Sequence, residues 1–125
     1  MPRVTLGFYR EGGRVRILEW LEHADSRTQY QARAALTRLA ANGHALRRPH
    51  ADFLSNGIYE LRFKVDRMNH RLLYFFHGRE VVVVSHHFTK QTERVPELEI
   101  QRAILHRERA IRSPMDFIQE AGDDF

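Results

Sequence analysis

Residues 57–92, GIYELRFKVDRMNHRLLYFFHGREVVVVSHHFTKQT, decide the fold of this chain. They contain three runs with β-strand character, joined by two short polar turns: Ile58–Val65, Arg71–His77 and Val81–Phe88. The first run alternates apolar and polar residues, as the two faces of a strand require. Short turns between such runs are typical of antiparallel hairpins. The stretch therefore predicts a three-stranded meander.

Hairpin folding of this meander gathers side chains that carry positive charge or titrate near neutral pH. They are Arg62, Arg71, His86, His87 and Lys90. Guanidinium and ammonium groups held on a rigid sheet bind phosphate oxygens well. Consecutive residues on a strand point to opposite faces, so only one of the two histidines can share the face of Arg62. We favour His86, although the position of the strand start leaves the parity open. The pattern predicts a phosphodiester site on the meander.

The segments around the meander predict an α+β fold. A strand is expected at Arg3–Tyr9, a helix at Arg14–His23, a second helix from Asp25 or Ser26 to Asn42, and a third at about 97–111. The first two helices form a hairpin in this interpretation. It packs on one face of a small, twisted, mostly antiparallel sheet and leaves the other face open.

Local signals mark the ends of these elements. Ser26 and Gln29 have the spacing of a capping box, in which each side chain satisfies an unpaired backbone N–H. Residues 44–56 are predicted to be a connector with a short extended piece at 52–54. Ser113–Pro114 interrupts the last helix, so we divide the chain into a domain at 1–112 and an acidic tail at 113–125.

The formal net charge of +4 understates the basic character of the main domain. The tail holds four acidic residues and no Lys or Arg, so residues 1–112 carry +8. A basic body of this size favours a polyanionic partner, most simply nucleic acid. An arginine-rich surface without such a partner is the alternative.

The composition also excludes several classes of site. The chain has no Cys, which removes disulfides, thiolate metal sites and Cys nucleophiles. No run reaches the length of a membrane span, no signal peptide opens the chain, and the eight histidines lack metal-ligand spacing. We therefore expect a cytoplasmic protein without a membrane anchor, a metal or another cofactor.

Three parts of the chain match, in order, the motifs of a known family. The matching residues are Gly57, Tyr59, Glu60, Leu61 and Arg62, then Arg71, Tyr74 and Phe75, and finally His86, Phe88, Lys90, Thr92, Pro96, Glu99, Ile100 and Ala103. Over about residues 52–105 the chain resembles the HigB-like, phage-derived branch of the RelE/ParE toxin superfamily. One departure is Gln91, where the family usually has a second Lys.

The resemblance implies a toxin of a type II toxin–antitoxin module. Such a toxin cleaves messenger RNA on the ribosome without a metal and is neutralised by a cognate antitoxin, often of the helix-turn-helix type. It implies a RelE-like fold, with Arg62, Arg71, His86 and Lys90 as catalytic residues. The candidate RNA-binding residues are Lys64, His87, Arg94 and Arg102.

Two other readings stay open at this point. In the ParE branch of the superfamily, the toxin acts by binding DNA gyrase and needs no cationic cluster for RNA chemistry. The departure at Gln91 keeps open a homologue that binds RNA or its partner without cutting. The acidic tail, in either case, is a candidate shield for the cationic site.

Overall fold

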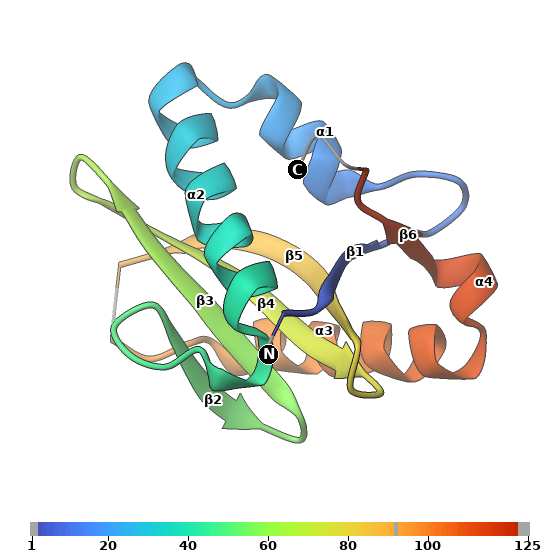
Figure 1. Ribbon diagram of the computed structural model, residues 1–125. Helices are drawn as coiled ribbons and strands as arrows, with labels where there is room; N and C mark the ends of the chain where they lie inside the picture. Colours follow the sequence, from blue (N-terminus) through green and yellow to red (C-terminus); the bar gives the residue numbers. More distant parts are fainter. Residues whose placement is uncertain (1–2, 92, 123–125) are drawn as a thin grey trace.

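In the computed structural model, which describes residues 3–91 and 93–122, six strands form one sheet in the order β2-β3-β4-β5-β1-β6 (Figure 1). The strands are β1 (Thr5–Tyr9), β2 (Ala51–Ser55), β3 (Ile58–Val65), β4 (Met68–His77), β5 (Val81–Lys90) and β6 (Ile118–Glu120). All neighbouring pairs are antiparallel except β1 and β5, which run parallel. The predicted meander is confirmed as β3, β4 and β5, and the α+β class is confirmed with it.

The helices lie on both faces of this sheet. They are α1 (Arg16–His23), α2 (Ser26–Asn42), α3 (Glu97–Arg112) and the short α4 (Pro114–Phe117), with a 3-10 turn η1 at Gly43–Ala45. Helices α1 and α2 form the predicted hairpin on one face, whereas α3 crosses the other (Figure 1). The expectation that this second face is open was therefore wrong.

Two hydrophobic layers hold the helices to the sheet. Leu61, Leu72 and Tyr74 pack with α2 on the hairpin side. Leu73 and Phe75 pack with Ala103 and other residues of α3 on the opposite side. The neighbours Leu72, Leu73 and Tyr74 are all buried because both faces of β4 are covered.

The predicted connector is more ordered than the sequence indicates. It contains η1 and the edge strand β2, which extends the expected piece at 52–54 by one residue at each end. At the other edge of the sheet, β6 pairs with β1, and α4 precedes it. Asp116 and Glu120 therefore lie beside β1, separated from β3 by β4 and β5, and do not cover Arg62. Asp123 and Asp124 lie outside the described residues.

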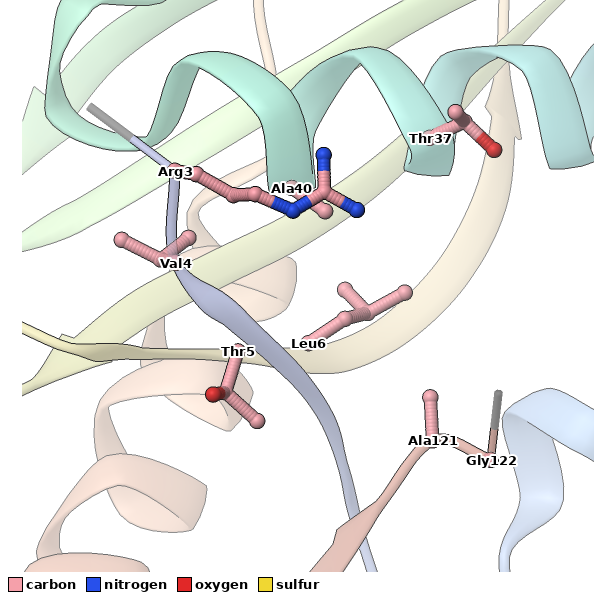
Figure 2. Close-up of a pocket in the computed structure, with 8 residues that line it drawn as sticks. All are labelled: Arg3, Val4, Thr5, Leu6, Thr37, Ala40, Ala121 and Gly122. Carbon is pink, nitrogen blue, oxygen red and sulfur yellow. The ribbon is translucent and has the colours of Figure 1, made fainter. Parts of the chain in front are cut away.

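A pocket of about 260 Å³ lies where the start of β1 meets α2 and the end of the described chain (Figure 2). Arg3 is the charged residue in its lining, and Figure 2 shows its guanidinium beside Ala40. The pocket contains none of the predicted site residues. Among the described helices, none combines the length and the apolar composition that crossing a membrane requires.

The start of α2 differs from the predicted capping box. Asp25 is the N-cap, and its carboxylate accepts a hydrogen bond of 2.8 Å from the backbone N–H of Thr28. Gln29 instead donates to the carbonyls of Leu21 and Glu22 at the end of α1. The side chain of Gln29 thus links the two helices of the hairpin rather than capping the second.

This cap gives a test with a matched control. Asp25→Ala removes the acceptor for the Thr28 N–H, so we expect a measurable fall in the urea midpoint of unfolding. Ser26→Ala, one residue further along, removes the hydroxyl that a capping box would need and should leave the midpoint unchanged. A larger loss for Ser26→Ala than for Asp25→Ala would restore the capping box.

Candidate functional site

The register of the meander places three of the predicted cations on one face. Arg62 is the cross-strand partner of Arg71, and Asn69 is the partner of Lys90 two residues along the same face of β4. Alternating residues of a strand share a face, so all three cations lie on the α3 side of the sheet. The hairpins therefore bring Arg62, Arg71 and Lys90 together as the sequence predicts.

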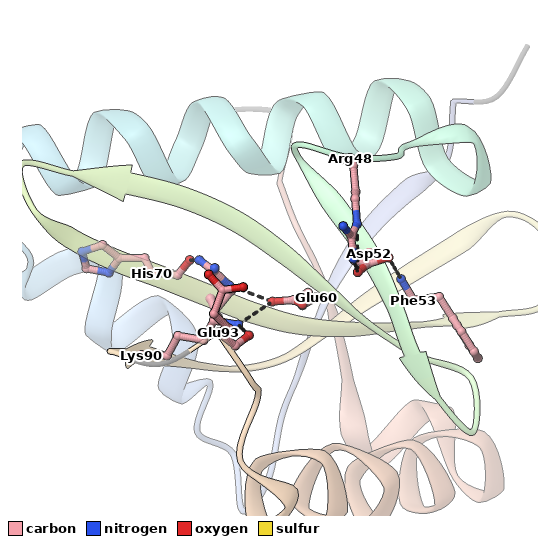
Figure 3. A network of polar contacts seen from close by, with 8 residues as sticks. Arg48, Asp52, Phe53, Glu60, His70, Lys90 and Glu93 are labelled. Carbon is pink, nitrogen blue, oxygen red and sulfur yellow. Dashed lines mark hydrogen bonds and ion pairs between the residues drawn. The ribbon is translucent and has the colours of Figure 1, made fainter.

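A buried carboxylate, Glu60, lies among these cations (Figure 3). The Nε of Arg71 donates to its Oε1 at 2.7 Å, and the Nζ of Lys90 is 3.8 Å from the same oxygen. All three side chains are less than 8% exposed. In a buried setting, removing one member of such a group leaves another charge uncompensated. Glu60 therefore holds the cluster together.

Sequence reasoning missed this role of Glu60. It recognised the residue as part of a family motif and as one of the polar positions of β3. One observation could have indicated it: by strand alternation Glu60 lies on the same face of the sheet as Arg62 and, through the pairing of Arg62 with Arg71, as Arg71. The parity alone does not show that this face is buried at Glu60.

Lys90 is held from both sides. Its ammonium donates to the backbone carbonyl of Glu93 as well as facing Glu60 (Figure 3). Val95, two residues after Glu93, is buried. Burial lowers the pKa of Lys90, Glu60 opposes this effect, and Arg71 and Arg62 lower the pKa further. The sequence analysis proposes proton transfer for Lys90, and a lowered pKa suits that role.

Arg71 keeps part of its guanidinium uncommitted. Its Nε donates to Glu60 and its Nη1 to the carbonyl of His70, at 2.7 and 3.0 Å. Burial also lowers the pKa of this guanidinium, although it stays protonated at neutral pH. Its Nη2 makes no hydrogen bond with a residue that the structure describes. The Nη2 nitrogen of Arg71 can therefore donate hydrogen bonds to a ligand.

Arg62 is the accessible member of the cluster. With Arg71 and Lys64 it lines an open pocket of about 310 Å³, next to His50 and Asn69. Within the described ranges the Arg62 side chain forms no hydrogen bond or ion pair. The pocket thus presents two guanidinium groups and one ammonium group, a combination suited to a phosphate group. We call it the phosphate pocket.

His86 lies on the same face but belongs to a different cluster. Its Nε2 is 2.9 Å from Oε1 of Glu99 on α3, and its Nδ1 is 2.8 Å from the hydroxyl of Ser85. Burial lowers its pKa to about 4. Because both ring nitrogens already have partners, the structure does not join His86 to the cations of the phosphate pocket.

A β-bulge decides which histidine faces α3. Leu73 pairs with His86 but Tyr74 pairs with Val84, so Ser85 is the extra residue in β5. The bulge lets Ser85 and His86 both point toward α3, which consecutive residues of a regular strand do not do. The choice of His86 over His87 for the face of Arg62 agrees with this register.

His87 lies on the opposite face, under the helical hairpin. Its ring stacks on Trp20 of α1 with 3.7 Å between ring centroids, and its Nε2 is 2.8 Å from Nδ1 of His70. Burial lowers its pKa to about 3. This position separates His87 from the phosphate pocket, so the structure does not support its predicted contact with RNA.

The remaining predicted residues lie at the edge of the same face. Arg94 is exposed between β5 and α3, and Arg102 is exposed on α3. Gln91, at the departure from the family motif, is also exposed. No group of side chains in the described part of the chain has the composition of a metal site.

The comparison with known families agrees with this architecture. Residues 19–108 match the family model described as Phage derived protein Gp49-like (DUF891). The chain belongs to this family. The Gp49-like family lies in the RelE-like group of toxin-like proteins, and the match covers most of the hairpin, the whole meander and most of α3. The chain matches no curated protein.

The buried carboxylate predicts a large effect of a small change. Glu60→Gln keeps the shape of the side chain but leaves Arg71 and Lys90 without their counter-charge. We expect a loss of about 3 kcal/mol in the free energy of unfolding, measured in urea. Glu19→Gln, which breaks the exposed ion pair with Arg14, is the matched control and should be near wild type. Equal effects of the two changes would show that the Glu60 cluster does not stabilise the fold.

The buried imidazoles predict a fall in stability on acidification. Burial lowers the pKa of His86 and His106 to about 4 and that of His87 to about 3, whereas the unfolded chain titrates near 6.5. Between these values the unfolded chain binds protons that the folded chain excludes, so stability is complete above about pH 6.5 and falls below it.

Urea unfolding between pH 7.5 and 4.5 measures this slope. His87→Phe keeps a ring against Trp20 and should reduce the slope by up to one proton, about 1.4 kcal/mol per pH unit. His23→Gln replaces an exposed imidazole and serves as the control. A stability that stays constant down to pH 4.5 would contradict the burial of these rings.

Proposed function

We propose that this protein is the toxin of a type II toxin–antitoxin module and that it cleaves messenger RNA on the ribosome without a metal. The observation that carries the proposal is the phosphate pocket, in which Arg62 and Arg71 face one another across β3 and β4. Membership in a RelE-like, toxin-like family supports the toxin class and an antitoxin partner. A helix-turn-helix antitoxin and a cytoplasmic ribosome are parts of the same proposal.

In this mechanism the scissile phosphate enters the phosphate pocket. The free guanidinium of Arg62 and the Nη2 of Arg71 donate to the non-bridging oxygens. Their charges stabilise the extra negative charge that develops on phosphorus in the transition state. Lys64 lies at the mouth of the pocket, where it contacts the next phosphate of the strand.

The reaction uses a nucleophile from the RNA itself. The ribose 2′ oxygen attacks phosphorus, the bond from phosphorus to the 5′ oxygen breaks, and a 2′,3′-cyclic phosphate forms. The 2′ hydroxyl loses its proton and the leaving 5′ oxygen gains one, so no net proton is released. Lys90, which shares Glu60 with Arg71 and has a lowered pKa, suits such a transfer. In this mechanism the Lys90 ammonium leaves the Glu93 carbonyl before the proton is transferred.

A second candidate is a toxin that acts by binding alone, on RNA or on a protein such as DNA gyrase. The observation that favours it is Glu60, which already occupies Arg71 and Lys90. In that case the cluster serves stability, and the messenger stays intact after induction.

Replacing the accessible clamp tests cleavage directly. Arg62→Ala removes a contact made to the charged transition state, so we expect the cleavage rate to fall about 10²–10³-fold. Because the Arg62 side chain carries no described hydrogen bond, the melting temperature should not change. Primer extension on a defined message, with and without ribosomes, measures the cut.

Two further variants separate charge from geometry. Arg71→Lys keeps a cation opposite Glu60 but lacks the fork of the guanidinium, so it should fold and cut poorly. Arg67→Ala, in the exposed β3–β4 turn, should cut at the wild-type rate. The binding toxin would be favoured if Arg62→Ala arrested growth as strongly as the wild-type protein and the messenger stayed intact in cells that express either one.

A further inference from the structure

Another pocket, of about 470 Å³, lies on the α3 side of the sheet. The end of β1, the start of α1, the bulge of β5 and one side of α3 enclose it, and it shares no lining residue with the phosphate pocket. Its lining consists of Tyr9, Glu11, Arg14, Arg16, Ser85, His86, Arg102, Leu105, His106 and Arg109. The mechanism proposed above uses none of these residues.

A chain of hydrogen bonds runs along the wall of this pocket. Oε1 of Glu99 is hydrogen-bonded to Nε2 of His86 at 2.9 Å, and Nδ1 of His86 is hydrogen-bonded to the Ser85 hydroxyl at 2.8 Å. The same hydroxyl meets Nδ1 of His106 at 2.8 Å. The chain therefore joins Glu99, His86, Ser85 and His106 in that order.

The direction of each bond follows from the carboxylate at one end. A carboxylate only accepts, so His86 donates through Nε2 and, being neutral, accepts at Nδ1 from the Ser85 hydroxyl. The Ser85 oxygen then accepts from Nδ1–H of His106. A neutral His106 with its proton on Nδ1 has a bare lone pair on Nε2. Burial keeps both rings neutral, since it lowers the pKa of each to about 4.

The ring of His106 is also fixed in position. Tyr9 stacks on it with 3.8 Å between ring centroids and 8° between the planes. The Tyr9 hydroxyl in turn donates to Glu11 at 2.6 Å, and Arg109 donates to the same carboxylate at 2.8 Å. In the part of the chain that the structure describes, Nε2 of His106 forms no hydrogen bond. It is an oriented acceptor without a donor.

Two of the four arginines in the lining keep their charge unpaired. Arg14 pairs with Glu19 and Arg109 with Glu11. Arg16 and Arg102 form no ion pair with any described residue. The pocket therefore combines two available guanidinium groups with one neutral acceptor.

We propose that this pocket binds a ribonucleotide unit, with its phosphate at Arg16 and Arg102 and its ribose 2′ hydroxyl donating to Nε2 of His106. A carboxylate or a phosphodiester group alone satisfies the arginines but offers His106 no donor at neutral pH. A deoxynucleotide lacks the hydroxyl next to its phosphate, so the pocket distinguishes RNA from DNA. His86 and Ser85 are positioning residues here, because they set the tautomer of His106.

The inference deepens the proposed function, since an RNA strand in the phosphate pocket supplies such a unit on the same face. A free mononucleotide has the same chemistry. It is the other source, and binding measurements distinguish the two.

Nuclear magnetic resonance of the histidine side-chain nitrogens tests the hydrogen-bond chain. At pH 7 we expect the proton of His106 on Nδ1 and that of His86 on Nε2, each from its ring ¹⁵N shifts. Ser85→Ala breaks the chain and should return His106 to a mixture of tautomers. A His106 protonated on Nε2 in the wild-type protein would overturn the assignment.

Calorimetric titration tests the ligand. Adenosine 3′-monophosphate should bind more tightly than its 2′-deoxy analogue, by about tenfold for one lost hydrogen bond in a buried site. His106→Asn keeps a donor near the position of Nδ1 but removes the Nε2 acceptor, so the ratio should fall to near one. Arg102→Gln should weaken both ligands equally. Arg112→Gln, the same change at the exposed end of α3, should alter neither.

A single-stranded hexaribonucleotide identifies the source. Tighter binding of the strand than of the mononucleotide, lost on Arg102→Gln, supports RNA, and equal binding supports a free nucleotide. Absence of binding, or equal affinity for the ribo and deoxy ligands, would overturn the proposal. Arg62→Ala should retain this binding while losing cleavage, so failure of the ribonucleotide pocket and failure of the nuclease give different results.

Discussion

One buried carboxylate organises the cationic face of this protein. Glu60 accepts from Arg71 at 2.7 Å and lies 3.8 Å from the ammonium of Lys90. Without it, the meander would place two desolvated cations side by side, with Arg62 adding a third charge. With it, the same three cations are tolerated in a small space, and Arg71 and Lys90 keep fixed positions. Glu60 therefore positions a cation of the phosphate pocket, Arg71, without lining the pocket itself.

The bulge at Ser85 is the second constraint, because it changes which side chains of β5 share a face. Before the bulge Val83 faces α3, and after it His86 does. The extra residue also brings the Ser85 hydroxyl between the rings of His86 and His106. A single irregularity in one strand thus places Ser85 and His86 together on this face, where both line the pocket of about 470 Å³.

The sequence was sufficient for the order of elements and for the grouping of Arg62, Arg71 and Lys90. Those predictions depend on alternation and on short turns, which are local in the sequence. It was insufficient for Glu60, since alternation assigns that residue to a polar face and does not show that its side chain is buried. The sequence was insufficient for His106 as well. The sequence alone places this residue in a basic helix, and its contacts with Tyr9 of β1 and Ser85 of β5 follow only from the packing of α3.

The two clusters differ in what they can contribute to chemistry. The ring of His86 has a partner at each nitrogen and a pKa of about 4, so at neutral pH it neither holds a spare proton nor has a free lone pair. In this arrangement neither ring nitrogen of His86 is available to a group at Arg62 and Arg71. Lys90 lies beside Arg71, where Glu60 and the Glu93 carbonyl both interact with its ammonium, and two other titratable groups, Lys64 and His50, line the pocket itself. Proton transfer by Lys90 therefore requires that its ammonium first leave the Glu93 carbonyl.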